Sequence, residues 1–438
     1  MNPPDRAIDP PADAPLAYRF RSAAGEHLLI VPFTRIFDLS ATDAAALDRD
    51  GGTLDALAGA LGRPAGGEAP LEGLAEPAPQ SLSLNVSASC NLSCGYCYAG
   101  RGGFAGAQPK PMTWPVARAA IDRLFAAATA DAPITIGFLG GEPFANRPLI
   151  HRAVVYAAEE GRRRGCDVRF SVTTNGTLLR PADLELLRRH PFAVTISLDG
   201  PAAVNDAQRP DHRGGGTWRL AAARIAGLLA APGRAKPAAR ATVTRHDLDL
   251  CARLEALAAL GFPEIGFAPL RVGPETSGPL REQDWPRYLE ALIGTAQREL
   301  ARVRQGLPIR LTNLAVALKQ LHRGASSPYP CGAGGGYFSV AADGRWYACH
   351  RAVGDPAFEL GSNDGLDPVR RRNFLAARHV HAQTECGRCW ARYLCSGGCH
   401  QEAPSRTAAS CDFVRDWLTF CLRAYCELGA PARGATPP

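Results

Sequence analysis

Between residues 81 and 324, the hydrophobic positions alternate between two periods. Short segments such as SLSLNVSA, with Leu82, Leu84 and Val86 on one face, have the period of a strand. Longer segments such as WPVARAAIDRLFAAATA, with Pro115 near its start and Thr113 as its expected cap, have the period of a helix. Strands are expected at 81–88, 134–139, 168–174, 193–200, 240–245 and 265–272. Helices are expected at 114–130, 149–165, 181–190, 217–231 and 250–261, and again between 282 and 323.

This alternation of strands and helices predicts the α/β fold class, with a parallel sheet built from right-handed crossovers. A full eight-stranded barrel would need two more strand–helix units than the pattern contains. We therefore expect an open, partial (β/α)6 TIM-like barrel.

The first 80 residues have a different pattern. Residues 17–62 predict strand, strand, helix, helix, with the strands at 17–22 and 27–33. The first helix covers 41–50, capped by Thr42 or Asp43, and the second covers 54–62, capped by Thr53. Residues 1–15 are rich in Pro, Asp and Ala and are expected to be disordered. Residues 63–80 have the composition of a linker, which predicts that the small N-terminal α+β region is separable from the barrel.

From Pro330 onward the alternation stops and cysteines become frequent. Residues 325–426 are expected to form a loop-rich region held together by metal, ending in a helix at 413–429. The predicted organisation is therefore an N-terminal region at 1–80, a barrel at 81–324 and a cysteine-rich region at 325–438.

The composition indicates which broad class of protein this is. The chain has 438 residues, 46% hydrophobic and 21% charged, which is typical of a soluble globular protein with two or three domains. No apolar run reaches the roughly 20 residues of a membrane helix, and the N-terminus lacks the pattern of a signal peptide, so a cytoplasmic location is expected. The net charge of +7 comes mostly from arginines scattered among acidic residues, so nucleic acid is not an expected partner. A membrane is not expected as a partner either, because no apolar run is long enough.

Fourteen cysteines are unusual for a compartment in which thiols stay reduced. Ten of them form two groups at short spacing, which indicates metal binding. The other four, in helical or strand patterns, are expected to be buried, inert thiols: Cys166, Cys251, Cys421 and Cys426.

The first group, Cys90-x3-Cys94-x2-Cys97, directly follows the first barrel strand. Three thiolates from one loop can bind three irons of a cubane cluster and leave the fourth iron open. A closed zinc site would need a fourth ligand, and no His or Cys follows within thirty residues. An open iron at the C-terminal mouth of a barrel is a catalytic arrangement.

These residues resemble the radical S-adenosylmethionine (SAM) enzymes, which implies that the open iron binds the amino and carboxylate groups of SAM. Gly140-Gly141-Glu142-Pro143, at the end of the second strand, is similar to the family's GGEP segment, whose glutamate and backbone hold the SAM amino group. The resemblance places Tyr96 against the adenine. It implies further SAM contacts at successive strand ends: Asn175 in Thr174-Asn175-Gly176, Ser197 and Asp199 for the ribose, Arg240 for the carboxylate, and Leu270 in Ala268-Pro269-Leu270 for the adenine.

The second group, Cys386-x2-Cys389-x5-Cys395-x3-Cys399 with Cys331, Cys349 and Cys411 around it, resembles the seven-cysteine signature of SPASM domains. The resemblance implies two auxiliary 4Fe–4S clusters, so that three 4Fe–4S clusters and SAM are the expected cofactors. Cys331, Cys349 and Cys399 would bind auxiliary cluster I, and Cys386, Cys389, Cys395 and Cys411 auxiliary cluster II. A pair of zinc sites is the alternative, with His350 or His400 as the eighth ligand. Asp343 and His350 are the candidates for proton transfer.

The resemblance implies an enzyme that forms a 5′-deoxyadenosyl radical and abstracts a hydrogen atom from a peptide or small protein. The favoured reaction is a C–C or thioether crosslink in a ribosomally made peptide, with a flavodoxin or ferredoxin as reductant. The alternative is a formylglycine-forming anaerobic sulfatase-maturating enzyme. A non-enzymatic electron carrier or zinc-stapled binding module would need neither the GGEP segment nor the barrel.

Residues 17–62 also resemble small peptide-recognition domains, which bind a leader peptide as an added strand. An N-terminal extension that packs on the barrel is the competing interpretation.

Overall fold

The computed structural model describes residues 9–49, 76–100, 110–129, 132–324 and 326–429. The chain divides into two compact units. One comprises Glu76–Asp284 and Gly332–Phe374, and the other comprises the described parts of Met1–Ala75, Trp285–Cys331 and Leu375–Pro438. This grouping differs from the three predicted regions, whose boundaries at 80 and 324 remain predictions.

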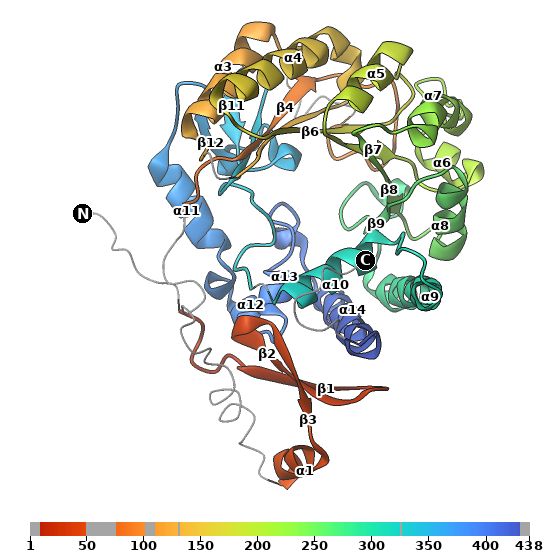
Figure 1. Cartoon of the computed structure of the whole chain (residues 1–438), viewed down its shortest axis with the longest axis vertical. Coiled ribbons are helices and arrows are strands. Elements are labelled where there is room, and N and C mark those ends of the chain that lie inside the picture. The colour runs from red at the N-terminus through yellow and green to blue at the C-terminus, as the bar shows by residue number, and fades with distance from the viewer. Residues whose placement is uncertain (1–8, 50–75, 101–109, 130–131, 325, 430–438) are drawn as a thin grey trace. The chain divides into compact units, whose positions relative to one another are not determined.

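The first unit is built on a sheet of ten strands, six of which form the predicted parallel array (Figure 1). Neighbouring strands follow one another in the chain, and each pair is parallel. The six are β4 (Ser81–Ser87), β5 (Ile134–Gly140), β6 (Val168–Thr174), β7 (Phe192–Ser197), β8 (Lys236–Val243) and β9 (Ile265–Pro269). The α/β class and the partial (β/α)6 barrel are therefore confirmed.

Helices cover the outer face of this curved sheet (Figure 1). They are α3 (Trp114–Ala127), α4 (Arg147–Arg164), α5 (Pro181–Arg189), α6 (Ala202–Gln208), α7 (Trp218–Ala230) and α8 (Leu250–Ala259), with short 3-10 turns η4 (Pro143–Asn146), η5 (Glu275–Ser277) and η6 (Glu282–Asp284). The short helix α6 was not predicted. Thr113 does occupy the position before α3, but its side chain makes no capping hydrogen bond, so that detail of the prediction is wrong.

The other edge of the sheet comes from the region expected to be loop-rich. β10 (Tyr337–Val340) pairs with β4 in parallel, and β11 (Arg345–Tyr347), β12 (Glu359–Ser362) and β13 (Gly365–Leu366) follow in antiparallel order. The turns η7 (His350–Ala352) and η8 (Pro356–Phe358) lie between them in the chain. These strands have two to four residues each, too few for alternation to reveal them in the sequence.

Side chains alternate between the two faces of each strand, so the register of a strand decides which residues lie on which face. On β4, Leu82, Leu84 and Val86 are fully buried on one face, as predicted, and the polar residues between them occupy the other face. β8 begins at Lys236, four residues earlier than expected, so Arg240 lies in mid-strand rather than at its start.

The second unit contains a three-stranded antiparallel sheet in the order β1 (Ala17–Ser22), β2 (Gly25–Ile30) and β3 (Arg35–Leu39), with η1 (Val31–Phe33) after β2. Only the first two strands were predicted. Helix α1 (Ala41–Arg49) is capped by Ser40 and not by Thr42 or Asp43, because the Ser40 hydroxyl accepts the Asp43 N–H at 3.1 Å. The predicted helix at 54–62 and most of the predicted linker lie outside the described residues.

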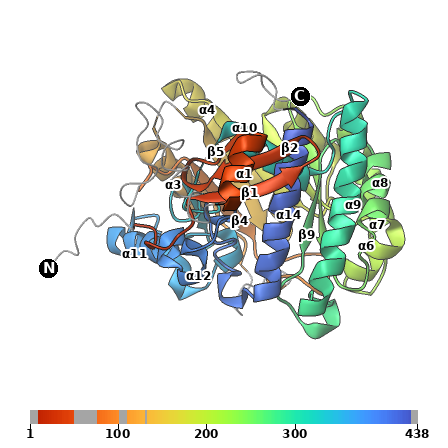
Figure 2. The ribbon, with the colours of Figure 1, turned by 90° about the horizontal axis from the view of Figure 1, so that it is seen from below.

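The remaining elements of the chain are α9 (Trp285–Arg304), α10 (Thr312–Arg323), α11 (Pro368–Arg378), α12 (Thr384–Gly387), α13 (Arg392–Cys395) and α14 (Ala408–Glu427), with η9 (Val380–Ala382) and η10 (Ala403–Ser405). Helices α9 and α14 lie side by side (Figure 2), and the ring of Phe413 is 5.1 Å from those of Trp285 and Tyr288. α14 starts at Ala408, five residues earlier than predicted, and so includes Cys411.

The burial of the four isolated cysteines agrees only in part with the prediction. Of the four cysteines expected to be inert and buried, Cys421 is buried, whereas Cys166, Cys251 and Cys426 are only half-buried. Across the described ranges, no helix combines the length and the apolar character needed to cross a bilayer.

Candidate functional site

The first cysteine group occupies a loop that directly follows β4, and hydrogen-bond donors are directed at its sulfurs. Cys90 Sγ accepts from the Leu92 N–H at 3.4 Å and from the Asn175 amide at 3.8 Å. Burial raises the pKa of Cys90 to about 12, and the nearby charges of Glu142, Cys94 and Cys97 raise it further. The raised pKa means that these neighbouring thiols ionise together only beside a positive charge such as a metal cluster. N–H donors to sulfur are also a feature of iron–sulfur ligands. The residues therefore fit the cluster that the spacing predicts.

The Gly140-Gly141 turn at the end of β5 lies directly against the start of this loop. Gly140 has φ +138°, and a Cβ on it would lie 2.3 Å from the Ser87 carbonyl oxygen. A Cβ on Gly141 would lie 2.4 Å from the Ser89 carbonyl oxygen, and the Glu142 N–H donates to that same oxygen at 2.9 Å. Both positions require glycine because two backbone segments meet there. The glycines thus fix the cysteine loop to β5.

Glu142 joins the same turn to the end of β6. Its carboxylate is fully buried and accepts three hydrogen bonds, from Thr174 Oγ1 at 2.6 Å, Asn175 N at 2.8 Å and Phe144 N at 3.1 Å. Burial raises its pKa above the ordinary value of a glutamate. The Asn175 amide in turn donates to Asn91 Oδ1, inside the cysteine loop, at 3.1 Å. Glu142 therefore organises the strand ends; its contact with the SAM amino group remains a prediction.

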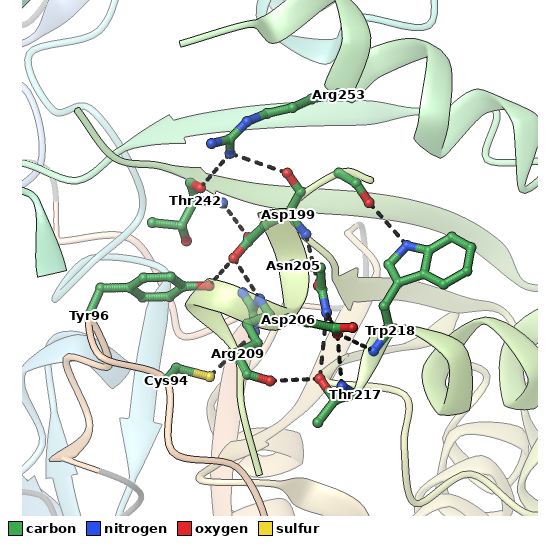
Figure 3. Close-up of polar contacts among 11 residues, drawn as sticks. Cys94, Tyr96, Asp199, Asn205, Asp206, Arg209, Thr217, Trp218, Thr242 and Arg253 are labelled. Atoms are coloured by element: carbon green, nitrogen blue, oxygen red, sulfur yellow. Dashed lines mark hydrogen bonds and ion pairs between the residues drawn. The ribbon is translucent and has the colours of Figure 1, made fainter. Parts of the chain in front are cut away.

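Asp199, which follows β7, is the centre of a second buried network (Figure 3). One carboxylate oxygen accepts from the Tyr96 hydroxyl at 2.5 Å and from Arg209 Nε at 3.0 Å, and the other accepts the Thr242 N–H at 2.8 Å. Burial raises the pKa of Tyr96 well above its ordinary value. Sequence reasoning assigned Tyr96 and Asp199 separate contacts with SAM, and the fold brings them together.

The loop that follows α6 is hydrogen-bonded to the cysteine loop. The Ser93 N–H donates to the Pro210 carbonyl at 2.8 Å, and the two ring nitrogens of His212 lie 2.8 Å from Ser93 Oγ and from the Cys90 carbonyl oxygen. Arg209 Nη1 donates to Cys94 Sγ at 3.9 Å. Sequence reasoning missed Arg209 and His212, because the only local signal is the content of Pro, Asp and Gly around them, which indicates a turn.

The structure places the other predicted residues as follows. Arg240 is exposed in the middle of β8, Leu270 is buried directly after β9, and Ser197 is half-buried at the end of β7. Asp343 lies in an exposed turn, where its carboxylate pairs with Arg345 at 2.7 Å. His350 Nδ1 lies 2.9 Å from the Tyr337 hydroxyl, and burial lowers the pKa of this histidine to about 4.

The second unit gathers the four cysteines predicted for auxiliary cluster II. Burial raises the pKa of Cys395 to about 11, and the charges of Cys386, Cys389 and Cys411 add to that shift, so the four thiols lie near one another. Arg406 donates to Cys386 Sγ, and the Ala391 N–H donates to Cys389 Sγ at 3.4 Å. These donors and this thiol set fit an iron–sulfur cluster.

The three cysteines predicted for auxiliary cluster I are divided between the units: Cys331 and Cys399 belong to one and Cys349 to the other, so their grouping remains a prediction. In the part of the chain that the structure describes, no three His, Cys, Asp or Glu side chains are positioned to hold one metal ion. The thiolates of a four-iron cluster are spaced more widely than the ligands of one ion, because each binds a different iron.

The parallel sheet, the cysteine loop and the Gly-Gly-Glu-Pro turn define a radical SAM fold, and residues 84–228 match the family described as the radical SAM superfamily. The mycofactocin maturase MftC of Mycobacterium ulcerans is 30% identical over 336 residues, which are 74% of this chain and 83% of that protein. The chain therefore belongs to the radical SAM superfamily, and it groups there with SPASM-type maturases. Members of this superfamily bind SAM at a 4Fe–4S cluster.

Other similarities agree with this membership. The serine-type anaerobic sulfatase-maturating enzyme of Klebsiella aerogenes is 25% identical over 348 residues, 74% of this chain and 80% of that enzyme. An uncharacterized protein of Methanocaldococcus jannaschii, MJ0907, is 35% identical over 133 residues, and the match spans only 43% of its length. The solved structure of anSMEcpe with bound AdoMet and a Kp18Cys peptide has a TM-score of 0.65 at 19% identity, covering 80% of this chain and 99% of that one. That likeness shows the fold.

Proposed function

We propose that this protein is a radical SAM maturase that oxidises a side chain of a ribosomally made peptide and so forms a C–C or thioether crosslink. The observation that carries the proposal is the second thiol array, Cys386, Cys389, Cys395 and Cys411, in a chain that also contains the SAM-type cysteine loop. A second redox centre provides an acceptor for the electron that remains after hydrogen abstraction. A crosslink removes two hydrogen atoms from the peptide: one leaves as an atom to the SAM-derived radical, and the other leaves as a proton to solvent while its electron goes to this acceptor.

The cofactors proposed are SAM and three 4Fe–4S clusters. Cys90, Cys94 and Cys97 would hold the cluster that binds SAM; when bound, this group supplies the one-electron reduction that cleaves SAM and yields a radical able to attack an unactivated C–H bond. The protein's own part is to hold the loop rigidly and to keep water out. The buried hydrogen bonds of Glu142 and Asp199 serve the first purpose.

The partner proposed is a precursor peptide that adds to the sheet of the second unit. Among the described residues, β3 is the last strand in the order β1-β2-β3, and its outer edge has backbone groups that an added strand could pair with. The test is hydrogen–deuterium exchange on the full chain, with and without a synthetic candidate precursor peptide. Protection of the amides of 35–39 supports the proposal, and protection confined to the opposite edge, β1, contradicts it.

The second candidate is formylglycine formation on a sulfatase, which the similarity to the Klebsiella enzyme favours. Oxidation of a serine to formylglycine also removes two hydrogen atoms, so the loss of mass does not separate the two reactions. The product would be treated with a hydrazide reagent, which labels an aldehyde and leaves a crosslink unlabelled. A labelled peptide of the sulfatase type supports the second candidate, and an unlabelled, fragmentation-resistant product supports the first.

A further inference from the structure

The guanidinium of Arg209 donates a hydrogen bond to a sulfur of the first cysteine loop. Its Nη1 is 3.9 Å from Cys94 Sγ, and its carbon Cζ lies 5.3 Å from the centre of the Tyr96 ring, which belongs to the same loop. The side chain is only 10% exposed. An arginine is charged at all accessible pH values, so a permanent positive charge lies beside this sulfur.

The position of this charge is fixed from several directions (Figure 3). Asp199, which is fully buried, accepts the Arg209 Nε–H at 3.0 Å. Thr217 Oγ1 donates to the Arg209 carbonyl at 2.6 Å, and Asp206 in turn accepts the Thr217 N–H at 2.8 Å. Burial alone would lower the pKa of Arg209, but the charges of Asp199, Tyr96 and Cys94 outweigh it and raise the pKa. The cation is therefore stable in its buried position.

A cation at this place has a defined consequence for a redox group held by the loop. Reduction of an iron–sulfur cluster adds one negative charge, and a positive charge and a hydrogen bond at a ligand sulfur stabilise that reduced state. Because Arg209 is largely buried, little solvent screens the interaction. The carboxylate of Asp199, next to Arg209, acts in the opposite direction.

We propose that Arg209 is a positioning residue that raises the reduction potential of the cluster bound by Cys90, Cys94 and Cys97, and that Asp199 limits this effect. The inference rests on the proposed function, since it requires the loop to hold a cluster. It predicts shifts of opposite sign for two residues that contact each other. A role confined to folding would not produce opposite signs.

The experiment is a redox titration of the full-length, anaerobically reconstituted protein, followed by electron paramagnetic resonance. The signal of this cluster is the part that is missing from a chain with Cys90, Cys94 and Cys97 all changed to Ala. In Arg209→Gln, the ratio of reduced to oxidised cluster at a fixed potential should fall about tenfold, which is a midpoint about 59 mV lower. In Asp199→Asn, the midpoint should rise above that of the unchanged protein.

The matched control is Arg213→Gln, which removes an exposed arginine from the same loop and should leave the midpoint unchanged. An unchanged midpoint in Arg209→Gln, or shifts of the same sign in Arg209→Gln and Asp199→Asn, would overturn the inference. If Arg209→Gln assembles no cluster, the test rests on Asp199→Asn alone. A midpoint of Asp199→Asn at or below that of the unchanged protein then overturns the inference. Failure of the unchanged protein to bind a cluster at the loop would instead refute the proposed function.

Discussion

The ring of Tyr18 in β1 stacks on the indole of Trp390, with centroids 3.9 Å apart and planes inclined by 4°. Trp390 directly follows Cys389 of the second thiol array, and the Tyr18 hydroxyl lies 3.0 Å from Thr419 Oγ1 of α14. Nearby, Val31 of η1 packs against Val380 and Tyr393. The N-terminal sheet and the cysteine array therefore share one hydrophobic core.

This packing predicts that Tyr18→Ala lowers the free energy of unfolding by about 2 kcal/mol, because a partly buried aromatic contact and its stacking are lost. Tyr18→Phe is the matched control: it keeps the stack, loses one hydrogen bond and should cost about 1 kcal/mol. Urea unfolding under anaerobic conditions, followed by circular dichroism and extrapolated linearly, measures both values. Equal stability of Tyr18→Ala and the unchanged protein would speak against a shared core.

The same contacts change the expectation for a truncated chain. The linker composition predicts that a chain without residues 1–80 still folds and cleaves SAM. The stacking of Tyr18 on Trp390 predicts instead that this deletion lowers the iron content of the second thiol array. Iron analysis of the truncated protein after anaerobic reconstitution decides between the two, and full retention of iron would support the separable module.

Removal of the first thiol group should separate its iron from that of the second. Changing Cys90, Cys94 and Cys97 to Ala should abolish 5′-deoxyadenosine formation and leave about eight of about twelve irons, since the other array has its own ligands. Cys421→Ala is the control, because Cys421 is buried and belongs to neither array. Continued 5′-deoxyadenosine formation in the triple variant would refute the assignment, as would stoichiometric zinc without iron in the unchanged protein.

Glu142→Gln should weaken SAM binding about tenfold, or about 1.4 kcal/mol, without changing the iron content. The amide has a donor where Glu142 accepts from Thr174, Asn175 and Phe144, so the strand ends that carry the predicted SAM contacts lose their alignment. Anaerobic equilibrium dialysis with labelled SAM measures the change. Glu185→Gln, on the exposed face of α5, is the control and should bind SAM as the unchanged protein does. A loss of iron in Glu142→Gln would show a wider structural role.

Stability should decrease in acid because His379 is buried in its neutral form. Burial, and then the nearby charge of His381, lowers the pKa of His379 from 6.5 to about 4. The unfolded chain therefore binds a proton that the folded chain does not, and stability is lost as the pH falls from about 6.5 toward 4. The loss from this group should be about 1–2 kcal/mol after allowance for solvent screening.

His379→Asn provides the comparison for this pH dependence. The His379 side chain accepts the His381 N–H at 3.3 Å, and asparagine keeps an acceptor without titrating. The difference in unfolding free energy between pH 7 and pH 4 should therefore be smaller in the variant by about 1–2 kcal/mol. Identical pH profiles would exclude His379 as a source of the acid sensitivity.

The sequence by itself determined the features that depend on neighbouring residues. The alternation of strands and helices predicted the parallel array β4–β9, because each element has its own hydrophobic period. The spacing of Cys90, Cys94 and Cys97 and the Gly140-Gly141-Glu142-Pro143 segment predicted the site, because a short loop brings those thiols together in any fold. The short strands β10–β13 could not be predicted in this way, because two to four residues are too few to show a hydrophobic period.

Only the tertiary structure decided which distant residues meet. Arg209 lies 115 residues from Cys94 in the chain, and Tyr18 lies 401 residues from Thr419, so no local pattern could link them. Those contacts follow from how the sheets and helices pack, which depends on all the buried surfaces together. The same packing placed Asp199 between Tyr96 and Arg209, although the sequence had suggested only separate contacts with SAM. The cysteine spacing predicts the chemistry of the loop, and that assignment stays a prediction, whereas the charges that surround the loop were set by the fold.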